Sequence, residues 1–389
     1  MKKDIVIFAG ALFDSKLWTN RQNVAVRLAE RGHRVIYVEP RHFWLTMLLG
    51  QFPGSGSRLA WLLRSHKPWE AQKNLWVVSQ FNAVPRSREI KWISQLNHWL
   101  NAPVVRMMIK IKGFNNPAVL IYDTEAAQYL SAFPNSTIVY DCVDDHRAQV
   151  GVNRNPRRVQ DEEEAIQKRA NGISVTTEVL LKRFETKNTN VKLVPNVADI
   201  AKFRDFVGEE PEDIKNISHP RIGTVGALDV YKIDFALLYN VASLRPEWNF
   251  ILVGPIDYAG VKGHEDKIEK IKSLKNVFLL GQKKMEEVPA YVYAFDVAII
   301  PYIKSPYNDA SFPLKFWEFV ASGKPVVAAN LPALESFKNI CSLVYTPEDF
   351  EKGIISALQN NPGNKQERVL EAEKHDWSVR VDVIEKMLE

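Results

Sequence analysis

The sequence is poor in cysteine and in long apolar runs. Only two of its 389 residues are cysteines, Cys142 and Cys341, and they lie far apart, without the spacing of a zinc site. A disulfide framework is therefore excluded, and both thiols are expected to be small buried groups in a reducing cytoplasm. No apolar run reaches the roughly 18 residues that a membrane-spanning helix needs.

Several short motifs are missing as well. No Gly-x-Gly-x-x-Gly follows a first strand, which argues against a dinucleotide oxidoreductase. No Asp-x-Asp stands between predicted strands, so no metal is expected. The opening MKKDIVIFAG begins like a signal peptide, but its apolar run is too short and a charged loop replaces the cleavage site. These residues are therefore predicted to form a first β-strand.

Length and charge divide the chain into two parts. A chain of 389 residues is too long for one ordinary core, which predicts two domains. Residues 1–200 carry 28 Lys and Arg against 18 Asp and Glu, whereas residues 201–389 carry 23 against 28. The N-terminal half is therefore the half expected to meet an anionic partner.

Short β-branched runs alternate with helical patterns along the whole chain. Strands are predicted at 4–8, 34–38, 75–78, 118–122, 137–141, 173–176, 191–194, 221–225, 249–253, 277–280, 297–300 and 325–328. Helices are predicted at 20–31, 156–170, 178–184, 233–244, 263–273, 285–293, 314–322 and 377–388. This alternation predicts α/β domains of the doubly wound, Rossmann-like kind, whose ligands bind at the carboxyl ends of the strands.

An acidic, polar segment at 205–219 interrupts the series and is predicted to link the two domains. The predicted division is an N-terminal domain at 1–204, the linker, a C-terminal domain at 220–374, and a last helix at 375–389.

An insertion at 41–112 breaks the rhythm of the N-terminal half. It holds six of the ten tryptophans, and residues 58–112 carry ten basic residues against two acidic ones. Segments 59–63 and 90–100 have helical apolar spacing. One interpretation is an interfacial helix that touches anionic lipid; the other is a pair of core helices with solvated charges. No nucleic-acid-binding motif accompanies the charge, so nucleic acid is not an expected partner.

The segment at 305–328, SPYNDASFPLKFWEFVASGKPVVA, carries the most chemical information. Pro313 suits the start of a helix, where free backbone N–H groups attract phosphate. Lys315 in the first turn opposes the helix dipole unless an anion such as a diphosphate binds there. Glu318, one turn later, could accept two hydrogen bonds from a ribose diol.

This segment resembles the donor-site signature of GT-B glycosyltransferases. The branch it resembles contains family 4 retaining enzymes and the bacterial transferases of teichuronic acid and exopolysaccharide synthesis. In the latter group a string P-L-K-x-x-E-(F/Y)-x-A-x-G-x-P-V-V recurs, and residues 313–327 match it. Further matches lie at 140–145, 194–196, 223–232, 276–281, 288–289 and 295–301. The resemblance implies two Rossmann-like domains that face each other across a cleft, with the last helix crossing back to the N-terminal domain.

The resemblance also implies roles in donor binding. Glu318 would bind the nucleotide ribose, and Lys232 would add positive charge toward the phosphates, unless it is merely a solvated residue at a helix start. Gly226 would let the donor approach its loop closely. The remaining donor residues implied are Phe312, Pro313, Leu314 and Lys315 at the diphosphate, and Gln282 and Pro301 in the base-binding region. The nucleotide sugar is thus a co-substrate, and no cofactor is implied.

Two departures from the family pattern leave the sugar and the stereochemical outcome open. Ala310 stands where family 4 enzymes carry a second glutamate, and Ala227 stands where an arginine commonly occurs. Asp144 and Asp145 lie side by side at a strand end, which raises the pKa of one of them and suits a general base, and hence inversion.

Other assignments stay open at this end of the N-terminal domain. Asp145 could instead cap a helix while Asp144 orders the loop, and His146 could touch the sugar. Asp14 is a third candidate base. Asn20, Arg21 and Asp14 are predicted to face the acceptor.

Together these observations predict a hexosyl- or uronosyltransferase of bacterial cell-surface glycan synthesis. It would use a UDP- or GDP-sugar and a lipid-linked or polysaccharide acceptor, and it would lie in the cytoplasm, peripheral on the inner face of the membrane. The alternatives are a nucleotide-sugar epimerase of the same fold and a non-catalytic sugar-nucleotide-binding assembly protein.

Overall fold

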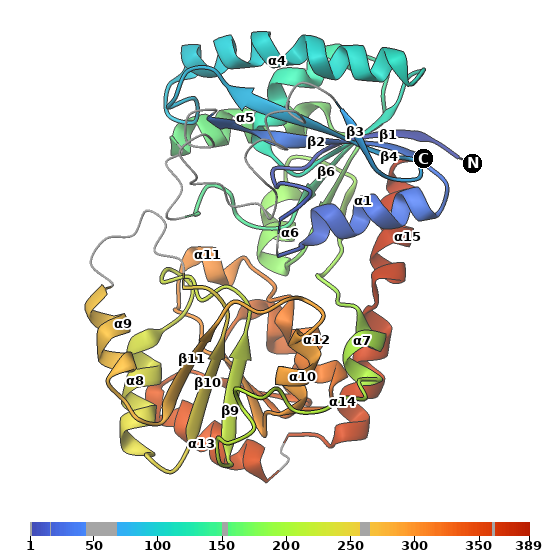
Figure 1. Ribbon diagram of the computed structural model, residues 1–389. Helices are drawn as coiled ribbons and strands as arrows, with labels where there is room; N and C mark the ends of the chain where they lie inside the picture. Colours follow the sequence, from blue (N-terminus) through green and yellow to red (C-terminus); the bar gives the residue numbers. More distant parts are fainter. Residues whose placement is uncertain (1, 16, 44–67, 150–154, 257–264, 360–361) are drawn as a thin grey trace.

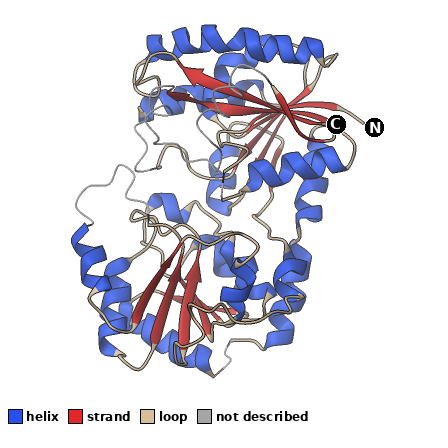
Figure 2. Cartoon of the chain, viewed as in Figure 1, coloured by secondary structure: helices blue, strands red, loops and turns tan. Residues whose placement is uncertain are grey.

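The computed structural model describes residues 2–15, 17–43, 68–149, 155–256, 265–359 and 362–389. They form two α/β domains, the N-terminal one above the C-terminal one in Figure 1. Each consists of a central sheet flanked by helices, as Figure 2 shows.

The N-terminal sheet has the strand order β3-β4-β2-β1-β5-β6-β7-β8, and of these strands only β3 runs antiparallel to its neighbour. Its strands are β1 (Asp4–Phe8), β2 (Arg34–Phe43), β3 (Trp69–Gln72), β4 (Leu75–Asn82), β5 (Ala118–Ile121), β6 (Ile138–Cys142), β7 (Gly172–Val175) and β8 (Val191–Leu193). The accompanying helices are α1 (Asn20–Glu30), α4 (Lys91–Ile111), η1 (Thr124–Ala132), α5 (Pro156–Arg169), α6 (Glu178–Phe184) and α15 (Trp377–Met387). Both faces of this sheet are covered, one by each of two buried apolar clusters, which is why its central strands are nearly continuous apolar runs.

The C-terminal sheet is parallel, with the order β11-β10-β9-β12-β13-β14. Its strands are β9 (Arg221–Val225), β10 (Asn249–Val253), β11 (Val277–Gly281), β12 (Val297–Ile300), β13 (Val326–Ala329) and β14 (Cys341–Val344). Its helices are α7 (Ile200–Arg204), α8 (Phe235–Leu244), α9 (Glu265–Lys272), α10 (Val288–Tyr293), α11 (Pro306–Asp309), α12 (Lys315–Ala321), η2 (Pro332–Phe337), α13 (Pro347–Leu358), α14 (Lys365–Ala372) and η3 (Glu373–His375). The strand order reverses between β9 and β12, so the loops after these strands diverge and open a crevice.

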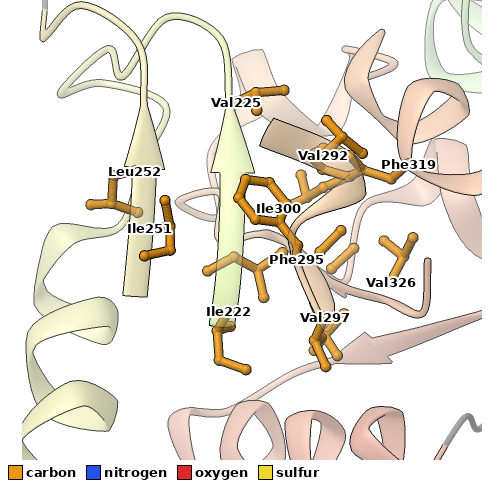
Figure 3. Packing of buried hydrophobic residues seen from close by; sticks show 14 of the residues in the cluster. Ile222, Val225, Ile251, Leu252, Val292, Phe295, Val297, Ile300, Phe319 and Val326 are labelled. Carbon is orange, nitrogen blue, oxygen red and sulfur yellow. The ribbon is translucent and has the colours of Figure 1, made fainter. Parts of the chain in front are cut away.

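The core below this crevice is tightly packed around β9 (Figure 3). Gly223 in β9 faces Phe295, and a Cβ atom at position 223 would come within 2.3 Å of the Phe295 ring. A side chain at 223 would therefore push Phe295 out of the core.

The chain passes between the domains twice, and the two crossings lie side by side. Ala198 and Asp376 form an isolated parallel bridge, and the Ala198 N–H donates to the His375 carbonyl oxygen at 3.3 Å. After the second crossing α15 packs into the N-terminal core through Trp377, Val381 and Ile384. The two crossings together form the connection between the domains.

The first crossing comes earlier than the sequence predicts. α7 already packs in the C-terminal core, because Ile200 and Phe203 belong to the apolar cluster around β9. Ile214, inside the predicted linker, is fully buried in the same cluster. The polar composition of 205–219 thus reflects a surface segment of the C-terminal domain rather than the connection itself.

The Trp-rich insertion contributes a hairpin strand, β3, and the long helix α4. The predicted helix at 59–63, with Trp44 and Trp61, lies outside the described residues. α4 extends well beyond the predicted 90–100 and contains Pro103. Among the described helices, α4 included, no stretch has both the length and the hydropathy for a membrane span.

Candidate functional site

Two adjoining pockets lie between the domains, on the side where the strands of the C-terminal sheet end. The inner pocket holds about 250 Å³, and its walls include Gly226, Lys232, Lys315 and, from the N-terminal domain, Asp144. The outer pocket holds about 810 Å³ and lies next to it. Glu318 and Gln282 line both, so one elongated ligand could occupy the two pockets together.

Lys315 is a buried ammonium group at the start of α12. Its side chain is 8% exposed, and burial lowers its pKa to about 8. Within the described part of the chain its Nζ has no hydrogen-bond partner, and the nearest ring, that of Tyr302, lies 5.7 Å away. A buried cation in this condition calls for an anionic ligand.

Gly226 makes room beside this ammonium group. Its φ is +102°, a conformation that suits glycine, and a Cβ atom there would stand 3.5 Å from the Lys315 Nζ. Any larger side chain at 226 would fill the space in front of Lys315.

Lys232 adds a second positive charge to the inner pocket. Burial by itself lowers the pKa of the Lys232 ammonium group. The surrounding tyrosines and Asp144 raise this pKa by more than burial lowers it, so the pKa lies well above its usual value. Its Nζ lies 3.8 Å from Asp229 and within 6 Å of the ring centres of Tyr231 and Tyr307. The inner pocket therefore presents two lysines to a ligand.

Glu318 lies one helical turn beyond Lys315 and is half-buried. Burial raises the pKa of its carboxyl group to about 7, although the nearby lysines Lys315 and Lys202 oppose the shift. A carboxylate in such surroundings is a strong acceptor for hydroxyl donors, because little water competes for it.

The N-terminal domain supplies the opposite wall of the inner pocket. Asp144 follows β6, and its Oδ1 accepts a hydrogen bond from the Ser311 hydroxyl of the C-terminal domain at 3.1 Å. Asn20 and Arg21, at the start of α1, also line this pocket. Asp14 instead lines the outer pocket.

Asp145 does not reach the pocket, which corrects its assignment as a candidate base. Its Oδ1 lies 2.7 Å from Arg183 and 3.5 Å from Arg147. Burial raises the pKa of Asp145, but these two guanidinium groups outweigh burial and hold the pKa below its usual range. Asp145 is thus a fixed anion within an ion-pair network, and it caps a turn rather than a helix, by accepting from the Arg147 N–H.

Four further positions from the sequence analysis fall in different places. Ala227 lines the inner pocket, whereas Pro301 lines neither pocket and its carbonyl accepts from the Asp234 N–H at 2.8 Å. His146 is buried outside both pockets. Ala310 packs into the N-terminal core, so the family's second glutamate would have no room there.

Sequence reasoning missed several residues of the inner pocket. Ser311 and Tyr302 come from the loops before α12 and after β12, and Asn196 was matched to the family without a role. Ser311 stands directly before the FPLK string, which is the one signal that pointed to it. No group of three or more metal-ligating side chains occurs among the described residues.

The C-terminal domain matches a known family. Residues 219–360 match the model of the family Glycosyl transferases group 1. Over 258 residues the chain is 29% identical to TuaH of Bacillus subtilis (strain 168), assigned as a teichuronic acid biosynthesis glycosyltransferase. That alignment covers 62% of this chain and 64% of TuaH, which is less than two thirds of the relative's length.

Solved structures with the same fold cover nearly the whole chain. The sucrose-phosphate synthase of Thermosynechococcus elongatus superposes with a TM-score of 0.70 and 16% identity, over 99% of this chain and 98% of that chain. Anabaena HepE, solved with UDP and glucose, gives a TM-score of 0.65 and 15% identity, over 100% of this chain and 99% of that chain. These structures confirm the predicted GT-B fold, and the group 1 glycosyl transferase match at 219–360 agrees with the prediction of a glycosyltransferase.

Proposed function

Because this chain carries a group 1 glycosyl transferase domain within a GT-B fold, we propose that it transfers a hexosyl or uronosyl group from a UDP- or GDP-sugar. The acceptor in this proposal is a lipid-linked or polysaccharide glycan of the bacterial cell surface. The teichuronic acid role assigned to TuaH supports the acceptor class, and the UDP and glucose bound to HepE support the donor class.

One observation carries the proposal: the buried ammonium of Lys315, without a hydrogen-bond partner in the described chain, beside Gly226 and Lys232. Two positive charges in one pocket suit the two phosphates of a nucleoside diphosphate, whose developing charge they would stabilise as the bond to the sugar breaks. Glu318, on the boundary of the two pockets, would accept hydrogen bonds from the ribose diol and direct the base into the outer pocket.

In this arrangement the sugar would lie near Asp144, which we propose as the general base. Its carboxylate faces the inner pocket from the N-terminal domain, and Ser311 holds it in place at 3.1 Å. It would take the proton from the acceptor hydroxyl as that oxygen attacks the anomeric carbon and the bond from this carbon to the diphosphate oxygen breaks, so that the nucleoside diphosphate leaves.

The donor assignment is tested by calorimetry with the UDP-, GDP-, ADP- and dTDP-sugars. A UDP- or GDP-sugar is expected to bind the wild type, and Lys315→Met is expected to weaken that binding about 10- to 100-fold, the range for a charge-assisted contact. Asp144→Asn should keep donor affinity but lose about 10²- to 10⁴-fold in transfer rate. Wild-type protein that binds none of these donors would refute the proposal.

We also propose that α4 holds the protein on an anionic membrane surface. Its outward face carries Trp92 and Trp99, which are 63% and 70% exposed, and Leu96, Met107 and Ile111. The exposed basic residues Lys91, Arg106 and Lys110 interleave with them. In Figure 1 this helix runs along the top of the N-terminal domain, on the side away from the C-terminal domain. Aromatic and basic groups on one exposed helix face suit the lipid–water interface.

Flotation with liposomes tests this second proposal. The wild type should float with vesicles that contain anionic lipid and remain behind with neutral ones. The double variant Trp92→Ser/Trp99→Ser should lose flotation, whereas Tyr345→Ser, which removes an aromatic side chain that is 69% exposed in the C-terminal domain, should keep it. Equal flotation of both variants would rule out α4 as the contact.

A further inference from the structure

Three consecutive residues before α12 are held by side chains of the other domain. The Thr177 hydroxyl donates to the Ala310 carbonyl oxygen at 3.2 Å, and Ser311 donates to Asp144 at 3.1 Å. The Asn196 amide Nδ2 donates to the Phe312 carbonyl oxygen at 2.7 Å. The segment 310–312 belongs to the C-terminal domain, yet side chains of the N-terminal domain hold it in place.

The Asn196 contact is the most enclosed of the three. Asn196 is 6% exposed, and its Oδ1 accepts from the Nδ2 of Asn20, which is 2% exposed, at 2.7 Å. The backbone just before Asn196 is anchored too, because Arg380 of α15 donates to the carbonyl oxygens of Val194 and Pro195. Asn196 is therefore held in one position, from which its amide binds the Phe312 carbonyl.

The Phe312 carbonyl matters because of the proline that follows it. The peptide between residues 312 and 313 is planar, and the ring of Pro313 fixes its own φ. At the junction between this segment and the turn that begins at Pro313, ψ of Phe312 is therefore the torsion that remains free. The direction of the Phe312 carbonyl is set by this angle. A hydrogen bond that holds this carbonyl also holds the position of Lys315.

We propose that Asn196, supported by Asn20, is a positioning residue that sets the phosphate-binding loop from the N-terminal domain. The inference rests on the proposed function, since it assumes that Lys315 binds the diphosphate. With the Asn196 hydrogen bond, Lys315 lies in the inner pocket. Without this hydrogen bond, the backbone rotates at Phe312 and the Lys315 ammonium group moves away from the phosphates. The position of the N-terminal domain thereby affects diphosphate binding. The contacts to the ribose and the base do not depend on it.

Calorimetry with nucleotides tests this coupling. The probes are the nucleoside diphosphate that the wild type binds, UDP or GDP, and the matching monophosphate. Asn196→Ala should bind the diphosphate about 5- to 10-fold more weakly, the size of effect that one neutral hydrogen bond supplies, with little change for the monophosphate. Asn20→Ala should produce part of this loss, and the double variant should lose less than the sum of the two.

A matched control separates positioning from general destabilisation. Asn101 is equally buried, and its amide also donates to a phenylalanine carbonyl, that of Phe81, at 2.7 Å, but it lines neither pocket. Asn101→Ala should lower the melting temperature yet keep wild-type affinity for both nucleotides.

Two outcomes would overturn the inference. It is wrong if Asn196→Ala binds the diphosphate as the wild type does, or if it loses affinity for diphosphate and monophosphate equally. A wild type that binds no nucleoside diphosphate would instead overturn the proposed function, and the inference with it.

Discussion

Lys315 and Glu318 have opposite pKa shifts with one cause. Burial disfavours the charged form of each, so the pKa of the lysine falls to about 8 and that of the glutamate rises to about 7. Both groups stay charged only in a narrow pH window, and the proposed binding of a nucleoside diphosphate would need both of them charged. The pocket is thus built for a ligand that carries negative charge and hydroxyl donors.

This pair predicts a pH dependence of diphosphate affinity. Below pH about 7 Glu318 gains a proton and accepts ribose hydroxyls poorly; above pH about 8 Lys315 loses its proton and its charge. The dissociation constant for UDP or GDP, measured by calorimetry from pH 5.5 to 9.5, should be lowest between these values.

The variant Glu318→Gln distinguishes the protein's titration from that of the nucleotide. Its amide does not titrate, so the loss of affinity on the acid side should shrink to what the ligand's own phosphate contributes, while the alkaline loss should persist. An unchanged acid limb in this variant would show that Glu318 does not contact the ligand.

The burial of Lys315 also predicts that this residue lowers the stability of the ligand-free protein while it serves diphosphate binding. Lys315→Met removes a buried charge but keeps the apolar stem, so the free energy of unfolding should rise by about 1–3 kcal/mol at pH 7. Thermal melting without ligand measures this, and the gain should shrink in excess diphosphate because the wild type binds it more tightly than the variant and is stabilised more. A lower melting temperature in the ligand-free variant would mean that Lys315 has a stabilising partner.

Not every site residue could be read from the sequence. Lys315 and Glu318 sit in one contiguous string, so their spacing on a helix already placed them together. Asp145 was misassigned because its partner Arg183 lies 38 positions away, and no local pattern indicates that the two side chains meet.

At the scale of elements, several strongly apolar strands were predicted at their observed bounds, whereas β2 and β4 extend five and four residues beyond their predicted ends. β1, β9, β10 and β12 match their predicted bounds because each is an apolar run bounded by polar or turn residues. The short helix α7 and the hairpin strand β3 were missed, since five- and four-residue elements have too little periodicity to show. No element was predicted at 341–372 either, where the structure has β14, α13 and α14. α12 was anticipated from its proline start and its glycine end.

A buried ion pair also joins the crossing helix α15 to the N-terminal sheet. Arg380 donates to both carboxylate oxygens of Asp141 at 2.8 and 2.7 Å, and neither side chain is exposed. Arg380→Met would leave Asp141 charged without its partner, so the free energy of unfolding in urea should fall by about 3–5 kcal/mol. The double variant Arg380→Met/Asp141→Asn should recover much of this loss, and no recovery would show that the pair is not what holds the helix.

At the scale of the whole molecule, the domain boundary is the feature that the sequence placed least well. Composition marks polarity, and residues 205–219 are polar because they cover the surface of the C-terminal domain. The true connection runs through buried residues near Ala198, where a bridge to Asp376 joins the two crossings. Such a pairing across nearly 180 positions appears only in the folded chain.

The two domains share one site, so each half alone should be incomplete. The C-terminal domain contributes the lysines and Glu318, whereas the N-terminal domain contributes Asp144 and Asn196. The helix α4 lies on the side of the N-terminal domain away from the C-terminal domain (Figure 1), so the proposed membrane contact through α4 would leave the cleft open to a donor.

In the proposed function, the inner pocket binds a diphosphate and Glu318 binds the ribose. A crystal structure of the protein with UDP or GDP tests it most directly. Phosphate oxygens should lie within hydrogen-bonding distance of the Lys315 Nζ, and both ribose hydroxyls should lie at the Glu318 carboxylate. Electron density for the nucleotide outside the two pockets, or a ribose turned away from Glu318, would contradict it.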